Sequence, residues 1–205
     1  MPLPRFLTFA LLGLALSVAS ILLLDYPLAP KAAALLEGHE ELWQLITDMG
    51  DSKYMGMLLL TLWVVAFAVG RSRPDNQFWP NLRTKAALVV AAVISTGVFV
   101  LVVKFIVGRS RPYTGEIGFS PFTLGSAHAS WPSGHTTSAF AFAVAAGLAF
   151  PALRWPLVAL AALTGFSRMV LEMHYFGDII MGATIGTLGA IVVYKTLGPK
   201  LGLKT

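Results

Sequence analysis

The sequence predicts an all-α integral membrane protein with six transmembrane helices and one amphipathic helix at the membrane interface. Hydrophobic residues make up 56% of the 205 residues and charged residues only 12%, roughly half the charged share of a soluble domain. The apolar residues also gather into six runs close to the length that crosses a bilayer. A chain of this composition cannot cover itself with polar surface, so lipid must form part of its solvent.

The six apolar runs are the predicted spans, and the length suits a single membrane-embedded domain over residues 1–205. The spans lie at roughly 6–24, 54–70, 84–107, 135–150, 156–173 and 178–197. Two of them, 54–70 and 135–150, are short and carry polar residues at their ends. The chain contains no cysteine, which excludes disulfides and thiolate chemistry.

The first run has two interpretations. Arg5 precedes an apolar region, and the small residues Ser17 and Ala19 follow it, which is the pattern of a secretory signal peptide. The apolar run nevertheless continues beyond that point to Asp25. We therefore favour an uncleaved membrane anchor.

The segment 31–50 is too polar to cross the membrane, and it predicts an amphipathic helix at the interface. Its apolar residues recur at helical spacing, with acidic residues on the other faces. The apolar stripe contains Leu35, His39, Leu42, Ile46 and Met49, and the acids are Glu37, Glu40, Glu41 and Asp48. We interpret the segment as a lid or packing element and His39 as a packed histidine.

Lysine and arginine residues gather in the loops on one side, and this asymmetry predicts the orientation of the chain. With the N-terminus inside, the inner face carries Arg5, Arg71, Arg73, Arg83, Lys85, Arg154, Lys195, Lys200 and Lys204. Both termini are then cytoplasmic. The end of span three, the start of span four, the end of span five and the start of span six all lie on the outer side.

Cationic residues stand at these outer helix ends. Arg109 is assigned to the common case of a cation that reaches up to the lipid headgroups. Lys104, Arg111 and Arg168 each belong to a polar cluster, and three converging cations repel one another unless an anion lies between them. Arginine offers a planar fork for phosphate oxygens and lysine a point charge.

The sequence Trp131–His135, WPSGH, predicts the start of a helix at Pro132 and Ser133. The first N–H groups of a helix have no intrahelical partner and attract anions. Gly134 would let an anion approach the backbone closely. By itself this segment also fits an ordinary capped helix.

His174 and Asp178 stand four residues apart between spans five and six. A turn at Gly177 would bring the carboxylate to the imidazole, fix its tautomer and leave the other ring nitrogen as a nucleophile or base. His135, on the same membrane face, is a candidate proton donor to a leaving oxygen. A structural polar contact between His174 and Asp178 is the alternative.

Metal binding is the rival chemistry for these side chains. His135, His174, Asp178 and Glu172 include the ligand types of a divalent ion. The nearby cations would oppose a metal's charge, whereas they suit an anionic substrate. We therefore favour a site without metal.

Three motifs together resemble the signature of the type 2 phosphatidic acid phosphatase (PAP2, or lipid phosphate phosphatase) superfamily, which is related to vanadium haloperoxidases. Lys104–Pro112 has the pattern K-x6-R-P, Pro132–His135 is P-S-G-H, and Ser167–Asp178 has the pattern S-R-x5-H-x3-D. The resemblance implies the helical core that these families share. The haloperoxidases are soluble and bind vanadate, so six spans favour the phosphatase branch.

The resemblance also implies the roles of the residues. His174 would attack phosphorus and form a phosphohistidine, oriented by Asp178, while His135 would protonate the leaving oxygen and later activate water. The phosphate would be held by Lys104, Arg111, Ser133, Gly134 and Arg168. The family uses no metal or other cofactor.

The predicted function is an integral-membrane lipid phosphatase of a bacterial-type inner membrane, with its site on the periplasmic side. Its partners would be the bilayer and a lipid phosphomonoester or diphosphate, with no nucleic acid. Candidate substrates are phosphatidylglycerophosphate, undecaprenyl diphosphate, phosphatidic acid and lipid A phosphate. A phosphotransferase using the same intermediate is one alternative, and a non-catalytic transporter of anionic lipids is another.

Overall fold

The computed structural model describes residues 1–73 and 76–202 as helices and connections, with no β-strand in this part of the chain. The helices are α1 (Leu3–Leu23), α2 (Asp25–Ala33), α3 (Glu40–Asp48), α4 (Ser52–Ser72), α5 (Phe78–Val107), α6 (Gly134–Ala149), α7 (Arg154–Val170) and α8 (Phe176–Leu197). Short 3-10 turns lie at Pro112–Thr114, Ser126–His128, Pro151–Leu153 and Pro199–Leu201. Lys204, which the sequence analysis places on the inner face, lies outside the described residues.

Four helices of the described chain are long and apolar enough to cross a membrane: α1, α4, α5 and α8. The predicted spans 135–150 and 156–173 correspond to α6 and α7, which have only 16 and 17 residues. A proline turn ends the first and begins the second, because Pro151 cannot continue the backbone hydrogen bonding of a helix.

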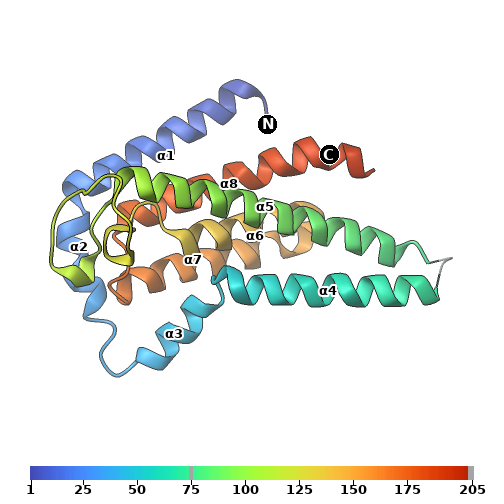
Figure 1. Ribbon diagram of the computed structural model, residues 1–205, viewed down its shortest axis with the longest axis horizontal. Helices are drawn as coiled ribbons and strands as arrows, with labels where there is room; N and C mark the ends of the chain where they lie inside the picture. Colours follow the sequence, from blue (N-terminus) through green and yellow to red (C-terminus); the bar gives the residue numbers. More distant parts are fainter. Residues whose placement is uncertain (74–75, 203–205) are drawn as a thin grey trace.

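Helix α6 lies at the centre of the bundle and packs against α5, α7 and α8 (Figure 1). Small residues allow this close approach, as in other membrane helix bundles. The buried alanines of α6 are Ala139, Ala141, Ala143, Ala145, Ala146 and Ala149. On α8, a Cβ atom at Gly182 would lie only 2.7 Å from the carbonyl oxygen of Ser133. The start of α6 is therefore held directly against the start of α8.

The prediction of one amphipathic helix over 31–50 is wrong in its extent. The structure has two separate helices, α2 and α3, because Gly38 in the connection adopts a left-handed backbone with φ of 73°. The prediction of a packed His39 is also wrong. His39 is exposed at the start of α3, and its Nδ1 lies 2.9 Å from the carbonyl oxygen of Glu37.

The polar helix ends meet at one end of the bundle, as the sequence predicts. Figure 1 shows the end of α5, the start of α6 and the α7–α8 turn together at the left, beside α2. The connection after α5 folds back over this end, since the Ser120 N–H donates to the Gly108 carbonyl at 2.7 Å and the Ser130 N–H to the Arg109 carbonyl at 3.0 Å. The fold thus brings three distant sequence segments to one place.

Candidate active site

His174 lies on the short connection between α7 and α8 and is only 3% exposed. Its backbone N–H donates to the Arg168 carbonyl oxygen at 3.1 Å, which ties the connection to the last turn of α7. Asp178 lies in the first turn of α8, and its Oδ2 is 3.5 Å from the His174 Nδ1. This separation is longer than a strong hydrogen bond, but it places the carboxylate at Nδ1 and leaves Nε2 for other partners.

Burial lowers the pKa of His174 to about 3, and the positive charges of Lys104 and Arg111 act in the same direction, although Asp178 opposes them. The imidazole is therefore neutral near neutral pH. A neutral imidazole with one nitrogen facing a carboxylate has a free lone pair on the other nitrogen, which is the state that a nucleophile requires.

Asp178 is fully buried and held from three sides. It accepts hydrogen bonds from Arg109 Nη1 at 2.6 Å, from the Ser130 hydroxyl at 2.5 Å and from the Tyr175 N–H at 2.8 Å. Buried carboxylates need such partners, because the loss of water is otherwise costly. The hydrogen bonds fix the direction in which Asp178 faces His174.

The prediction that Arg109 reaches to the headgroups is wrong. Arg109 is 2% exposed, its Nη2 pairs with Asp25 Oδ2 at 2.8 Å, and its guanidinium lies 4.3 Å from the centre of the Tyr175 ring. Although burial acts to lower the pKa of Arg109, Asp178 and Asp25 raise it overall. The guanidinium is a buried bridge between two carboxylates.

Asp25 and Ser130 also contact the buried Arg109–Asp178 pair, and the sequence analysis did not identify either residue as part of the site. Asp25 also accepts hydrogen bonds from the Ser20 hydroxyl at 2.6 Å and from the Gly177 N–H at 2.8 Å, so it holds the start of α8. The available signal was an isolated acid at the end of the apolar run of α1.

The three predicted phosphate-binding cations come from three different elements. Lys104, in the last turn of α5, donates to the Ala129 carbonyl oxygen. Arg111 lies 3.3 Å from the Met173 sulfur, and Arg168 donates to the Thr47 hydroxyl at 2.7 Å. Within the described residues, the buried Nε atoms of Arg111 and Arg168 have no hydrogen-bond partner. These donors are available to an anion.

Ser133 and Gly134 form the predicted helix start. Ser133 is the N-cap of α6, and its hydroxyl oxygen accepts a hydrogen bond from the Thr136 hydroxyl at 2.9 Å. A Cβ atom at Gly134 would lie 3.8 Å from Cε of Lys104, so the first turn of α6 faces this cation. The charges of Lys104, Arg111 and Arg168 all act on His135, so these four side chains lie within electrostatic reach of one another.

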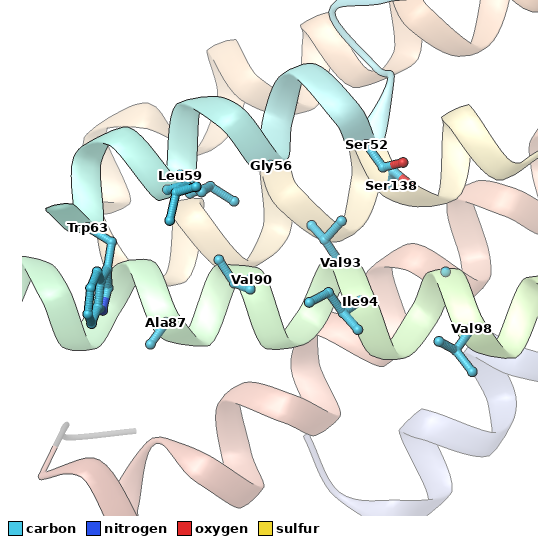
Figure 2. Close-up of a pocket in the computed structure, with 12 residues that line it drawn as sticks. Ser52, Gly56, Leu59, Trp63, Ala87, Val90, Val93, Ile94, Val98 and Ser138 are labelled. Atoms are coloured by element: carbon cyan, nitrogen blue, oxygen red, sulfur yellow. The ribbon is translucent and has the colours of Figure 1, made fainter.

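A small cavity of about 210 Å³ adjoins this site, and Lys104, Gly134 and His135 are among its lining residues. It shares Ser52, Gly97 and Ser138 with a larger cavity of about 700 Å³. Figure 2 shows the larger cavity between α4 and α5, with apolar side chains along most of its length. We call this larger cavity the α4–α5 groove.

A search of the described residues finds no group of three or more histidine, aspartate or glutamate side chains that could hold a metal ion.

Comparison with known proteins gives the following similarities. Residues 85–200 match the model of the PAP2 superfamily. The chain is 30% identical to a lipid A 1-phosphatase of Rhizobium etli over 197 residues, covering 87% of this chain and 81% of the relative. It is 32% identical to the undecaprenyl-diphosphatase BcrC of Bacillus subtilis over 124 residues, 58% of each chain.

Solved structures share the fold. A transmembrane PAP2-type phosphatidylglycerolphosphate phosphatase of Bacillus subtilis has a TM-score of 0.72 at 22% identity, covering 95% of this chain and 96% of that one. LpxE of Aquifex aeolicus has a TM-score of 0.62 at 21% identity, covering 84% of this chain and 95% of that one. The chain thus shares its helical arrangement with these two structures.

Proposed function

The chain belongs to the PAP2 superfamily and is a membrane-embedded lipid phosphatase, and from this premise we propose that it hydrolyses a phosphomonoester or terminal diphosphate of a lipid through a phosphohistidine. The observation that carries the mechanism is the buried His174, with Asp178 at its Nδ1 and the positive charges of Lys104 and Arg111 acting on it. Phosphoryl transfer depends mainly on positioning and on stabilising the charge of the transferring group.

In the first step, Nε2 of His174 forms a bond to phosphorus while the bond from phosphorus to the lipid oxygen breaks. His135 gives a proton to that oxygen. In the second step, a water oxygen attacks phosphorus, His135 accepts the water proton, and the bond from phosphorus to His174 breaks. Phosphate leaves and both histidines return to their initial states.

The non-bridging oxygens would be held by fixed donors. Lys104, Arg111 and Arg168 supply positive charge, the first N–H groups of α6 supply the positive end of its dipole, and the Ser133 hydroxyl supplies a further donor. These groups are already in place without substrate, so little reorganisation is needed as charge develops.

We propose that the lipid tail lies in the α4–α5 groove. The groove adjoins the small cavity beside Lys104 and His135 and is lined by apolar residues such as Leu59, Val90 and Ile94. Gly56, in the interior of α4, also lines it, and a Cβ atom added there would meet no atom within 4 Å. Glycine inside a helix is normally unfavourable, and here its missing side chain leaves room in the groove.

Gly56→Leu is expected to lower kcat/KM for a long-chain lipid phosphate by about tenfold or more, and to leave a short-chain soluble analogue within about twofold. A Cβ atom at this position meets no protein atom within 4 Å, so the leucine side chain would begin in open space and extend into the groove. Ala68→Leu, which places a leucine at an exposed position of α4 outside the groove, is the matched control. Equal losses of kcat/KM for the long-chain and short-chain substrates would show that the lipid tail does not lie in this groove.

We propose that six helices, α1 and α4–α8, cross an inner membrane, with the site outside and both termini in the cytoplasm. The support is the asymmetry of lysine and arginine. Because the chain has no cysteine, Glu116→Cys at an exposed position of the connection after α5 gives a single reporter thiol. It should react with an impermeant maleimide in intact spheroplasts, and reaction only after permeabilisation would reverse the orientation.

Candidate substrates are phosphatidylglycerophosphate, undecaprenyl diphosphate, phosphatidic acid and lipid A phosphate, and proteins named for the first, second and fourth of these are among those similar to the chain. Purified protein in detergent with EDTA should release phosphate from at least one member of this panel, and orthovanadate should inhibit it. A strict magnesium requirement would contradict the metal-free mechanism. Product that appears only when an acceptor lipid is added would identify a phosphotransferase.

A further inference from the structure

Asp51 lies beside His135 in the structure, although no signature motif contains it. It precedes α4 in the connection from α3, and it lies outside the residues 85–200 that match the family model. Its Oδ1 caps α4 by accepting the Lys53 N–H at 2.8 Å. Its Oδ2 is 3.6 Å from Nε2 of His135. One carboxylate thus faces both a helix start and the proposed proton donor.

We propose that Asp51 is a positioning residue for His135, so that the site contains two histidine–carboxylate pairs with different tasks. Asp178 orients the nucleophile His174, and Asp51 orients and charges the acid His135. This inference rests on the proposed function, because a proton donor is needed only if a lipid oxygen leaves.

The charges around His135 explain why a carboxylate is needed there. Burial acts most strongly against a positive charge on His135, and Arg168 on α7, Arg111 on the long connection and Lys104 on α5 act in the same direction. The negative charge of Asp51 acts against these influences on His135. An opposite charge close to a histidine favours its protonated form, which is the form that can donate.

The chemistry balances without a proton on Asp51. The Nε2–H of the His135 imidazolium faces the Asp51 carboxylate, and the Nδ1 proton goes to the leaving lipid oxygen. His135 is then neutral and retains its Nε2–H. During hydrolysis of the phosphohistidine, Nδ1 takes a proton from the attacking water, and the imidazolium is restored.

A competing role for Asp51 is support of Arg168, because the charges of both Asp51 and Asp48 act on that guanidinium. Asp48→Asn is therefore the matched control, since it removes a charge near Arg168 without touching His135. Asp51→Asn and Asp51→Ser both keep a good N-cap for α4 and remove the carboxylate charge, and Asp51→Asn also keeps the size of the side chain. Together the variants distinguish three roles of Asp51: the N-cap of α4, the support of Arg168 and the positioning of His135.

The experiment compares two leaving groups. One substrate is a lipid alkyl phosphate, whose alkoxide leaves poorly, and the other is an alkyl-tailed nitrophenyl phosphate, whose phenolate leaves without a proton. Asp51→Asn and Asp51→Ser should lower kcat for the alkyl phosphate by roughly 10- to 100-fold and for the nitrophenyl phosphate by less than about threefold. The alkaline limb of the kcat–pH profile for the alkyl phosphate should move to lower pH.

A double variant adds a further check. Asp51→Asn in a His135→Gln background should cause no additional loss, because the group on which Asp51 acts is already gone. An additive loss, an equal loss on both substrates, or a raised KM shared with Asp48→Asn would overturn the assignment. If the wild type is active and Asp51→Asn has the same kcat on both substrates, this inference is refuted while the proposed function stands. A wild type that hydrolyses neither substrate would refute the proposed function and this inference with it.

Discussion

Replacement of His174 by alanine is expected to lower phosphate release by roughly 10⁴-fold or more, because the atom that attacks phosphorus is removed. The cations, the α6 N-terminus and the groove remain, so affinity for the uncleaved lipid should change by less than about threefold. Phosphate release and equilibrium lipid binding, measured on the same purified protein, test the two parts separately. Near-normal turnover would refute the assignment of the nucleophile.

The covalent intermediate gives this prediction a second readout. Rapid quenching of the wild type with ³²P-labelled substrate should trap phosphate on the protein in an acid-labile, base-stable form, as expected for a phosphoramidate bond. The His174→Ala protein should trap none. His128→Ala is a suitable control, because His128 contacts Ser110 in the same connection at 3.2 Å and has no role in the proposed reaction. Labelled His174→Ala protein would place the intermediate on another residue.

The three motifs and the approximate helices were predictable from the sequence because both depend on local patterns. Runs of apolar residues identify α1, α4, α5 and α8, and Ser133 is a recognisable N-cap. The placement of Lys104, His135 and Asp178 at one end of the bundle followed from helix order alone. The chemical roles of these residues stay predictions.

Contacts between distant residues were not predictable. Arg109 was misassigned because its partner Asp178 is 69 positions away along the chain, and its other partner, Asp25, looks like the polar end of an apolar run. Asp51 has the residue type of an ordinary helix cap, and only the packing of α4 beside α6 brings it to His135. The single helix predicted at 31–50 was wrong for a local reason. Gly38 interrupts the segment, but the regular spacing of apolar residues continues across it and suggested one helix.

Arg109→Met is expected to destabilise the protein by about 3–5 kcal/mol, since it leaves two buried carboxylates without their shared cation. Asp25 and Asp178 are 1% and 0% exposed, so water cannot replace the guanidinium. Thermal unfolding in detergent should show a lowered Tm, and activity should fall because Asp178 no longer has a fixed direction. Arg109→Lys keeps the charge but cannot reach both carboxylates in the same way, so its Tm and activity should be intermediate.

Arg111→Met is the contrasting variant. Arg111 contacts the Met173 sulfur and the Ala129 carbonyl oxygen, and no ion pair to it is present in the described part of the chain. Its loss should reduce activity through phosphate binding with little change in Tm. Asp25→Asn combined with Arg109→Met should recover part of the Tm lost in Arg109→Met, because one unpaired charge is removed. An Arg109→Met protein with normal Tm and turnover would show that the buried bridge is dispensable and that Asp178 is held by Ser130 and the α8 backbone alone.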